Sequence, residues 1–140
     1  KDAENGDKLA MYELGLCYHS GKKGFKGDRK ETYKWFKKAN AAGCVKSMAM
    51  EGLCLLHGYG VEKDEATGMF HLVNAECQGS DFAAYAIGLY FSKERHCSYK
   101  KMLACKILEK ALSGSYTHKQ LVASDKEKAK ALIDKLQSSD

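Results

Sequence analysis

Apolar residues recur along this chain at the three- and four-residue spacing of helices that have one buried face. One such stripe comprises Leu9, Tyr12, Leu16 and His19, and another comprises Thr32, Trp35, Phe36 and Ala39. This spacing is typical of amphipathic α-helices. Asp28 and Asp64 stand where an acidic side chain caps a helix, and Glu31 would complete a capping box with Asp28. Gly43 and Gly79 stand where glycine ends a helix, so the pattern predicts a series of short helices.

The predicted helices recur with a period of about 36 residues. Gly15, Gly52 and Gly88 lie 37 and 36 residues apart. Offsets of 7, 8, 10, 11 and 15 lead from Asp28 to Trp35, Phe36, Lys38, Ala39 and Gly43, and from Asp64 to His71, Leu72, Asn74, Ala75 and Gly79. A third unit has Lys100 in place of the aspartate. A period of this length indicates stacked helix pairs, as in an α-solenoid.

Each of these glycines lies inside a predicted helix, where glycine costs about 1 kcal/mol relative to alanine. We therefore expect two helix backbones to approach closely at these points. The expected small partners on the second helices are Ala39, Ala75 and Ala111.

Glu51 departs from the apolar pattern, because it occupies the register of Leu14 and Ile87. A buried carboxylate must be paired or neutral. We expect Glu51 to turn to the edge of the helix while Met48 and Met50 fill the core. The alternative is that Glu51 is a polar feature of a binding groove.

The expected fold is all-α: a right-handed α/α solenoid of about three helix-pair repeats plus a C-terminal capping helix. The predicted single domain divides into an upstream repeat's tail (1–6), three repeats (7–43, 44–79 and 80–114), and a connector with the capping helix (115–140). The capping helix would bury Ala129, Leu132, Ile133 and Leu136, and expose Lys126, Lys130 and Asp134. Because residues 1–6 resemble the end of a repeat, we expect a fragment of a longer protein.

Composition is that of a globular domain, with 140 residues, 44% hydrophobic and 29% charged. Apolar stretches of at most six residues, as in residues 82–87, exclude a membrane-spanning helix, which needs roughly 20. The cysteines are Cys17, Cys44, Cys54, Cys77, Cys97 and Cys105. They form no Cys-x-x-Cys pair, so we expect reduced thiols and favour the cytoplasm, with disulfides of a secreted protein as the alternative.

Few residues have the spacing of a catalytic or metal site. Cys54–His57 and His96–Cys97 are two pairs without further ligands, whereas zinc needs about four. A glycine-rich loop over residues 21–27 lacks the ending of a phosphate-binding loop. We therefore expect no enzyme activity, no metal and no cofactor.

The net charge of +5 is concentrated in one segment. Its basic residues are Lys22, Lys23, Lys26, Arg29, Lys30, Lys34, Lys37 and Lys38. A solvated helix face is the simplest interpretation. The functional alternative is binding of nucleic acid or another anionic surface through this patch.

Taken together, these motifs resemble the Sel-one-like repeat, a relative of the tetratricopeptide repeat. The first repeat matches that family's unit at Leu14, Gly15, Tyr18, Asp28, Trp35, Phe36, Lys38, Ala39 and Gly43. The second matches at Gly58-Tyr59-Gly60-Val61 and at Asp64, whereas the third has Glu94–Cys97 in place of the glycine turn. The resemblance covers about residues 1–114.

This resemblance implies a non-catalytic adaptor that binds another protein or peptide segment on the concave face. By register the lining residues would be Tyr12, Leu16 and His19 from the first repeat, Lys46, Ala49, Leu53 and Leu56 from the second, and Tyr85, Leu89 and Ser92 from the third. The tyrosines would be the anchors. For both the leucines and the tyrosines the alternative is a place in the core between repeats. We expect a monomer or weak self-association.

Overall fold

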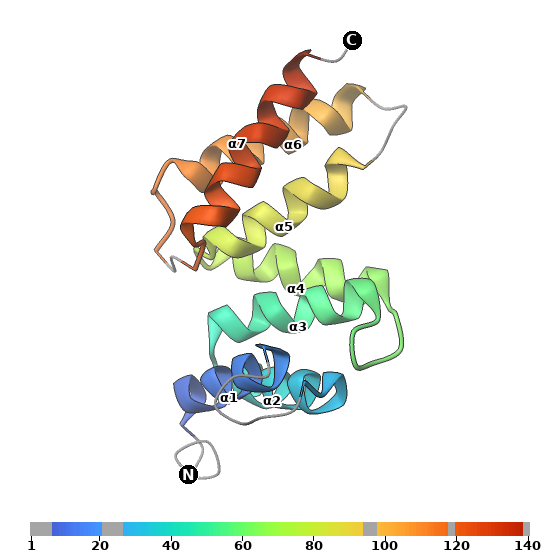
Figure 1. Cartoon of the computed structure of the whole chain (residues 1–140), viewed down its shortest axis with the longest axis vertical. Coiled ribbons are helices and arrows are strands. Elements are labelled where there is room, and N and C mark those ends of the chain that lie inside the picture. Colours follow the sequence, from blue (N-terminus) through green and yellow to red (C-terminus); the bar gives the residue numbers. More distant parts are fainter. Residues whose placement is uncertain (1–6, 21–26, 94–97, 118–119, 139–140) are drawn as a thin grey trace. The chain divides into compact units, whose positions relative to one another are not determined.

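The computed structural model describes residues 7–20, 27–93, 98–117 and 120–138, and every regular element in these ranges is an α-helix (Figure 1). The helices are α1 (Lys8–Ser20), α2 (Arg29–Ala41), α3 (Val45–His57), α4 (Glu65–Cys77), α5 (Asp81–Ser92), α6 (Ser98–Leu112) and α7 (Ala123–Ser138). They belong to two compact units, of which unit 1 ends at Ala75 and unit 2 begins at Glu76. The predicted repeat boundaries at 43/44 and 79/80 fall between helices.

In unit 1, α1 packs against α2, and α2 packs against α3. The core cluster of this unit comprises Met11, Tyr12, Trp35, Phe36, Ala39, Cys44 and Cys54. The Tyr12 and Phe36 rings meet with centroids 6.0 Å apart. Phe36 is the most completely buried aromatic residue of this cluster, so the central residues of the two predicted stripes face each other. Leu9 and His19, at the ends of the first stripe, are exposed.

The predicted helix caps are present with one change. Asp28 accepts hydrogen bonds from the N–H groups of Lys30 and Glu31 at 3.0 and 3.2 Å. The capping box with Glu31 is not formed, because the Asp28 N–H donates instead to the Tyr18 carbonyl at 3.2 Å. Asp64 caps α4 through both the N–H and the hydroxyl of Thr67, and these bonds lower the pKa of the Asp64 carboxyl.

The glycines inside the helices do mark close packing, but their partners differ from those expected. A Cβ at Gly15 would lie 2.7 Å from the Phe36 ring, and one at Gly88 would lie 2.6 Å from Leu108. The expected partners, Ala39, Ala75 and Ala111, are buried but are not the nearest contacts. The glycines accommodate large side chains located three residues before those alanines.

In the second helix pair the two helix backbones themselves come into contact. A Cβ at Gly52 would lie 2.8 Å from the carbonyl oxygen of Gly68, and one at Gly68 would lie 2.7 Å from that of Gly52. Thr32 and Ala104 occupy the register of Gly68 in the other repeats. The α3 and α4 backbones therefore meet glycine against glycine.

The turn at residues 58–61 forms as predicted. Gly58 and Gly60 adopt φ values of 71° and 76°, which favour glycine. A Cβ at Gly60 would collide with the carbonyl oxygen of Arg29, so this turn packs onto the start of α2. The corresponding segments 21–26 and 94–97 lie outside the described residues.

In unit 2, α6 packs against both α5 and α7. The capping helix has the predicted faces, with Ala129 and Ile133 buried and Lys126, Lys130 and Asp134 exposed. The preceding connector is anchored by polar contacts in addition. Asp81 accepts hydrogen bonds from the N–H groups of Gln120 and Leu121 at 2.6 and 3.2 Å. Tyr116 donates to Glu76 at 2.6 Å, and burial together with Glu76 raises the pKa of this phenol.

Candidate partner-binding surface

Four of the residues predicted to line a concave face belong to the interior. Tyr12, Ala49, Leu56 and Tyr85 are all buried, at 8% exposure or less. Tyr12 packs in the unit 1 core and Tyr85 in the unit 2 core. The two tyrosines are therefore not exposed anchors, and this part of the expectation is corrected. They fill space beside Phe36 and Leu108, the residues that pack onto the helix glycines.

The other six predicted residues keep part of their surface. Leu16, Lys46, Leu53, Leu89 and Ser92 are half-buried, and His19 is exposed. Leu16 on α1 and Leu53 on α3 hold the same register position, 37 residues apart. Within unit 1, partly exposed apolar side chains therefore repeat on the first helix of each pair.

His19 belongs to a cluster that the sequence did not reveal. Its Nδ1 lies 2.9 Å from the Tyr59 hydroxyl, and the two rings pack edge to face. The Arg29 guanidinium lies 4.8 Å from the centroid of the same tyrosine ring. Tyr59 thus links the end of α1, the start of α2 and the turn after α3. The glycine turn was a signal for this contact, because it presses residues 58–61 onto α2.

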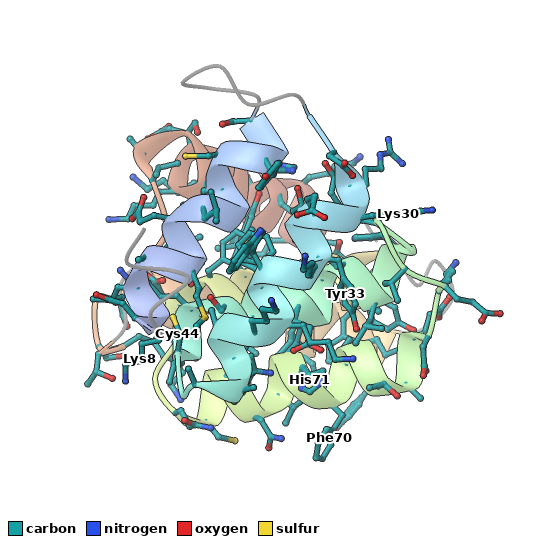
Figure 2. The ribbon with its side chains drawn as sticks, turned by 90° about the horizontal axis from the view of Figure 1, so that it is seen from below. Lys8, Lys30, Tyr33, Cys44, Phe70 and His71 are labelled. Carbon is teal, nitrogen blue, oxygen red and sulfur yellow. The ribbon has the colours of Figure 1, made fainter. Side chains whose placement is uncertain are left out.

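Glu51 is buried at 5% exposure, so it does not turn to the edge as expected. Asn40 donates to Glu51 Oε1 at 2.7 Å, and the Tyr33 hydroxyl reaches Oε2 at 3.5 Å. His71 Nε2 lies 3.8 Å from Oε2. Figure 2 shows Tyr33 and His71 on the two helices that flank α3 at this point. Partners from α2 and α4 thus satisfy a carboxylate at an otherwise apolar position.

This carboxylate changes the acidity of its neighbours. Burial, with Glu51 as the second cause, raises the pKa of the Cys54 thiol to about 12. Burial and the nearby Glu51 also raise the pKa of the Tyr33 phenol. Both groups are therefore held protonated at neutral pH, and Cys54 is a poor nucleophile.

The basic segment is described only from Arg29 onward, because Lys22, Lys23 and Lys26 lie outside the described residues. Its described members, Arg29, Lys30, Lys34, Lys37 and Lys38, are exposed along α2. Besides Arg29 on Tyr59, two of them pack on Trp35, with the Lys38 and Lys34 ammonium groups 4.8 and 5.7 Å from the ring centroid.

Three further observations bear on the kind of site. In residues 7–20, 27–93, 98–117 and 120–138, no three His, Cys, Asp or Glu side chains cluster as metal ligands would. The described cysteines Cys17, Cys44, Cys54, Cys77 and Cys105 are free thiols, and Cys97 lies outside the described residues. None of the helices in the described part has the length and apolar character needed to cross a membrane.

Helix pairs that recur at a fixed period and pack closely at their glycines define a helical repeat protein. Comparison with known families gives its particular family. Residues 8–44 and 45–80 each match the Sel1 repeat, and the chain belongs to the Sel1 repeat family. Its fold is accordingly an all-α helical repeat solenoid. Sel1 repeats act generally as protein–protein interaction modules.

Solved structures with the same repeat are similar over most of the chain. A Sel1 repeat protein from Oxalobacter formigenes is 26% identical, with a TM-score of 0.62 over 93% of this chain and 92% of that one. The protective antigen c5321 of uropathogenic Escherichia coli, which displays an SLR fold, is 27% identical with a TM-score of 0.66. This second match covers 81% of this chain and 24% of the antigen.

A curated relative comes from Arabidopsis thaliana. The ERAD-associated E3 ubiquitin-protein ligase component HRD3B is 35% identical over 65 residues. The match covers 46% of this chain but only 10% of HRD3B.

Proposed function

We propose that this chain is a scaffold module that binds a segment of a partner protein along α1 and α3, the first helices of the two pairs in unit 1. Its membership of a family of protein-interaction repeats supports this proposal. The observation that carries it is the shared partial exposure of Leu16 and Leu53 at one register position of α1 and α3. Contiguous exposed apolar patches with a polar rim mark protein–protein interaction sites.

The proposed surface excludes the residues that are buried in the interior. In unit 1 it comprises Leu16, His19, Lys46 and Leu53, and unit 2 separately has the partly exposed residues Leu89 and Ser92. A few apolar residues with polar neighbours suit an extended segment or a helix of a partner. The alternative of nucleic-acid binding has no support from the relatives, and we do not propose it.

Site-specific photo-crosslinking tests this proposal. A benzophenone amino acid is introduced at Leu16 or at Leu53, and the irradiated protein is recovered from cell extract for mass spectrometry. Lys128 and Lys130, both exposed on α7, are the control positions. We expect one protein to be captured from both Leu16 and Leu53 and from neither control.

Capture of the partner protein must also depend on the apolar side chains of Leu16 and Leu53. A Leu16→Ser, Leu53→Ser variant that keeps its helical circular dichroism should lose capture of that protein. Equal crosslinking at all four positions, or none at the two leucines, would contradict binding along the first helices.

A further inference from the structure

The second helices of unit 1 carry a different surface from the first helices. On α2 the exposed face bears Arg29, Lys30, Lys34, Lys37 and Lys38, whereas Glu31 is the acidic residue of this helix. Arg29 packs on Tyr59, and Lys34 and Lys38 pack on Trp35. These ring contacts restrict three of the side chains, so less conformational entropy is lost when they bind an anion.

On α4 two of the corresponding register positions carry large apolar residues. Phe70 replaces Lys34 and Val73 replaces Lys37, each 36 residues further along. Phe70 is 63% exposed and Val73 is 43% exposed. Phe70 points away from the ribbon of α4, and Lys30 points away from α2 (Figure 2). Two exposed apolar residues three positions apart lie on one face of a helix.

The Glu51 cluster connects these two helices. Tyr33 precedes Lys34 on α2, and His71 follows Phe70 on α4. Both Tyr33 and His71 reach the same carboxylate oxygen, at 3.5 and 3.8 Å. Lys34 and Phe70 therefore each stand next in sequence to a residue that contacts the same buried carboxylate of unit 1, and they hold the same register position on α2 and α4.

We propose that this outer face of α2 and α4 binds an acidic segment of a partner protein that also carries a bulky apolar side chain. The carboxylates of the segment would meet the α2 cations, and its apolar side chain would pack on Phe70 and Val73. The cations from Arg29 to Lys38 extend over about 13 Å, which an extended chain covers in about four residues. Charge complementarity selects an acidic occupant. A Sel1 repeat module favours a protein over a bilayer or a nucleic acid.

Peptide selection with counter-selection tests this surface independently of the first helices. A random dodecapeptide display library is first depleted on a Lys34→Glu, Lys38→Glu variant and then selected on the wild-type chain. Peptides that bind elsewhere, including those on α1 and α3, are removed in the first step. The peptides that survive should be rich in Asp and Glu and should contain an aromatic or large aliphatic residue.

The selected peptides are then measured by fluorescence anisotropy. Reversal of Lys34 and Lys38 should weaken binding about tenfold, because two favourable charge contacts become repulsive. Phe70→Ser should weaken it about fivefold or more, as expected for loss of an apolar anchor. A second reversal, Lys30→Glu with Lys37→Glu, gives the same test where loss of the Trp35 contacts disturbs folding.

Matched controls lie on unit 2. Lys126→Glu with Lys130→Glu changes the net charge equally, and Val122→Ser removes a comparably exposed apolar residue. Neither should change binding by more than about twofold. The proposal is overturned if no acidic peptide survives selection, or if the controls weaken binding as much as the α2 and α4 variants. Tighter binding to vesicles with 30% phosphatidylserine, to a single-stranded oligonucleotide or to a second copy of the chain would overturn it too.

Discussion

Glu51→Leu tests whether the buried carboxylate is a defect or a structural contact. From the sequence alone this substitution would stabilise the chain, because it restores the apolar pattern of Leu14 and Ile87. The structure reverses the expected sign. Asn40 donates to Glu51 at 2.7 Å, and Tyr33 and His71 complete the surroundings of the carboxylate.

The size of the effect follows from the groups that the substitution leaves without a partner. A buried donor that loses its acceptor costs about 1–3 kcal/mol. Since Asn40 is only half-buried, we expect Glu51→Leu to lower the free energy of unfolding by about 2 kcal/mol. Asn40→Leu alone should cost a similar amount, because the carboxylate keeps only its longer contacts. The double variant removes both polar groups, and such replacements are often neutral.

The prediction is therefore non-additivity, which a double-mutant cycle measures. The double variant should be more stable than the sum of the single effects by at least about 1 kcal/mol. Trp35 is the single tryptophan and belongs to the unit 1 core, so its fluorescence in urea reports on this unit. Asp134→Leu on α7 shares none of these contacts, and its effect should simply add to that of Glu51→Leu. A stabilising Glu51→Leu, or a coupling below about 0.5 kcal/mol, would refute the reasoning.

Three further predictions concern backbone packing, thiol acidity and capping. Gly52→Ala should lower the free energy of unfolding by about 1–3 kcal/mol. This loss should exceed that of Gly88→Ala, because the new Cβ meets a backbone oxygen at position 52 and the Leu108 side chain at position 88. Thermal melts in which Gly88→Ala is the more destabilised variant would contradict this. Cys54 should resist iodoacetamide at pH 8 in the folded chain. The folded-state pKa of Cys54 is raised from 9.0 to about 12, so the protonated thiol contributes fully to stability below pH 9, and this contribution is lost as the pH rises through 12. Urea titrations between pH 9 and pH 12 measure the loss. Rapid alkylation of Cys54 in the folded chain would contradict the raised pKa. Asp28→Ala should lower stability by about 1 kcal/mol, measured by circular dichroism in urea, and an unchanged midpoint would show that the cap contributes nothing.

Much of the helical framework could be predicted because its signals are local or repeat at a fixed offset. Asp28 and Asp64 act on N–H groups two or three residues away, so their position in the chain is nearly sufficient to identify a cap. Gly58 and Gly60 require a left-handed backbone that few other residues adopt. The repeat then indicates where helices pair, since one matched turn predicts the next.

The side-chain contacts across helices were harder to predict, because register identifies a face but not the depth of a residue. Tyr12 and Tyr85 share a face with Leu16 and Leu89, yet the tyrosine rings lie inside while the leucines stay partly exposed. Tyr12 lies beside Phe36, which packs against Gly15, and Tyr85 lies in one cluster with Leu108, which packs against Gly88. The burial of each tyrosine therefore depends on a large side chain of the partner helix, which the sequence of one helix does not contain.

The burial of Glu51 could not be predicted from its register either. Its departure from the apolar repeat pattern nevertheless gives information about a contact. Position 51 breaks the apolar pattern, and position 71 places histidine where the other repeats have Trp35 and Ile107. Each departure alone looks like a surface substitution, but the two side chains lie 3.8 Å apart in the folded unit. Because repeats superpose by register, two polar departures in one unit predict a contact between them, and the cycle at Asn40 measures how strongly the fold depends on it.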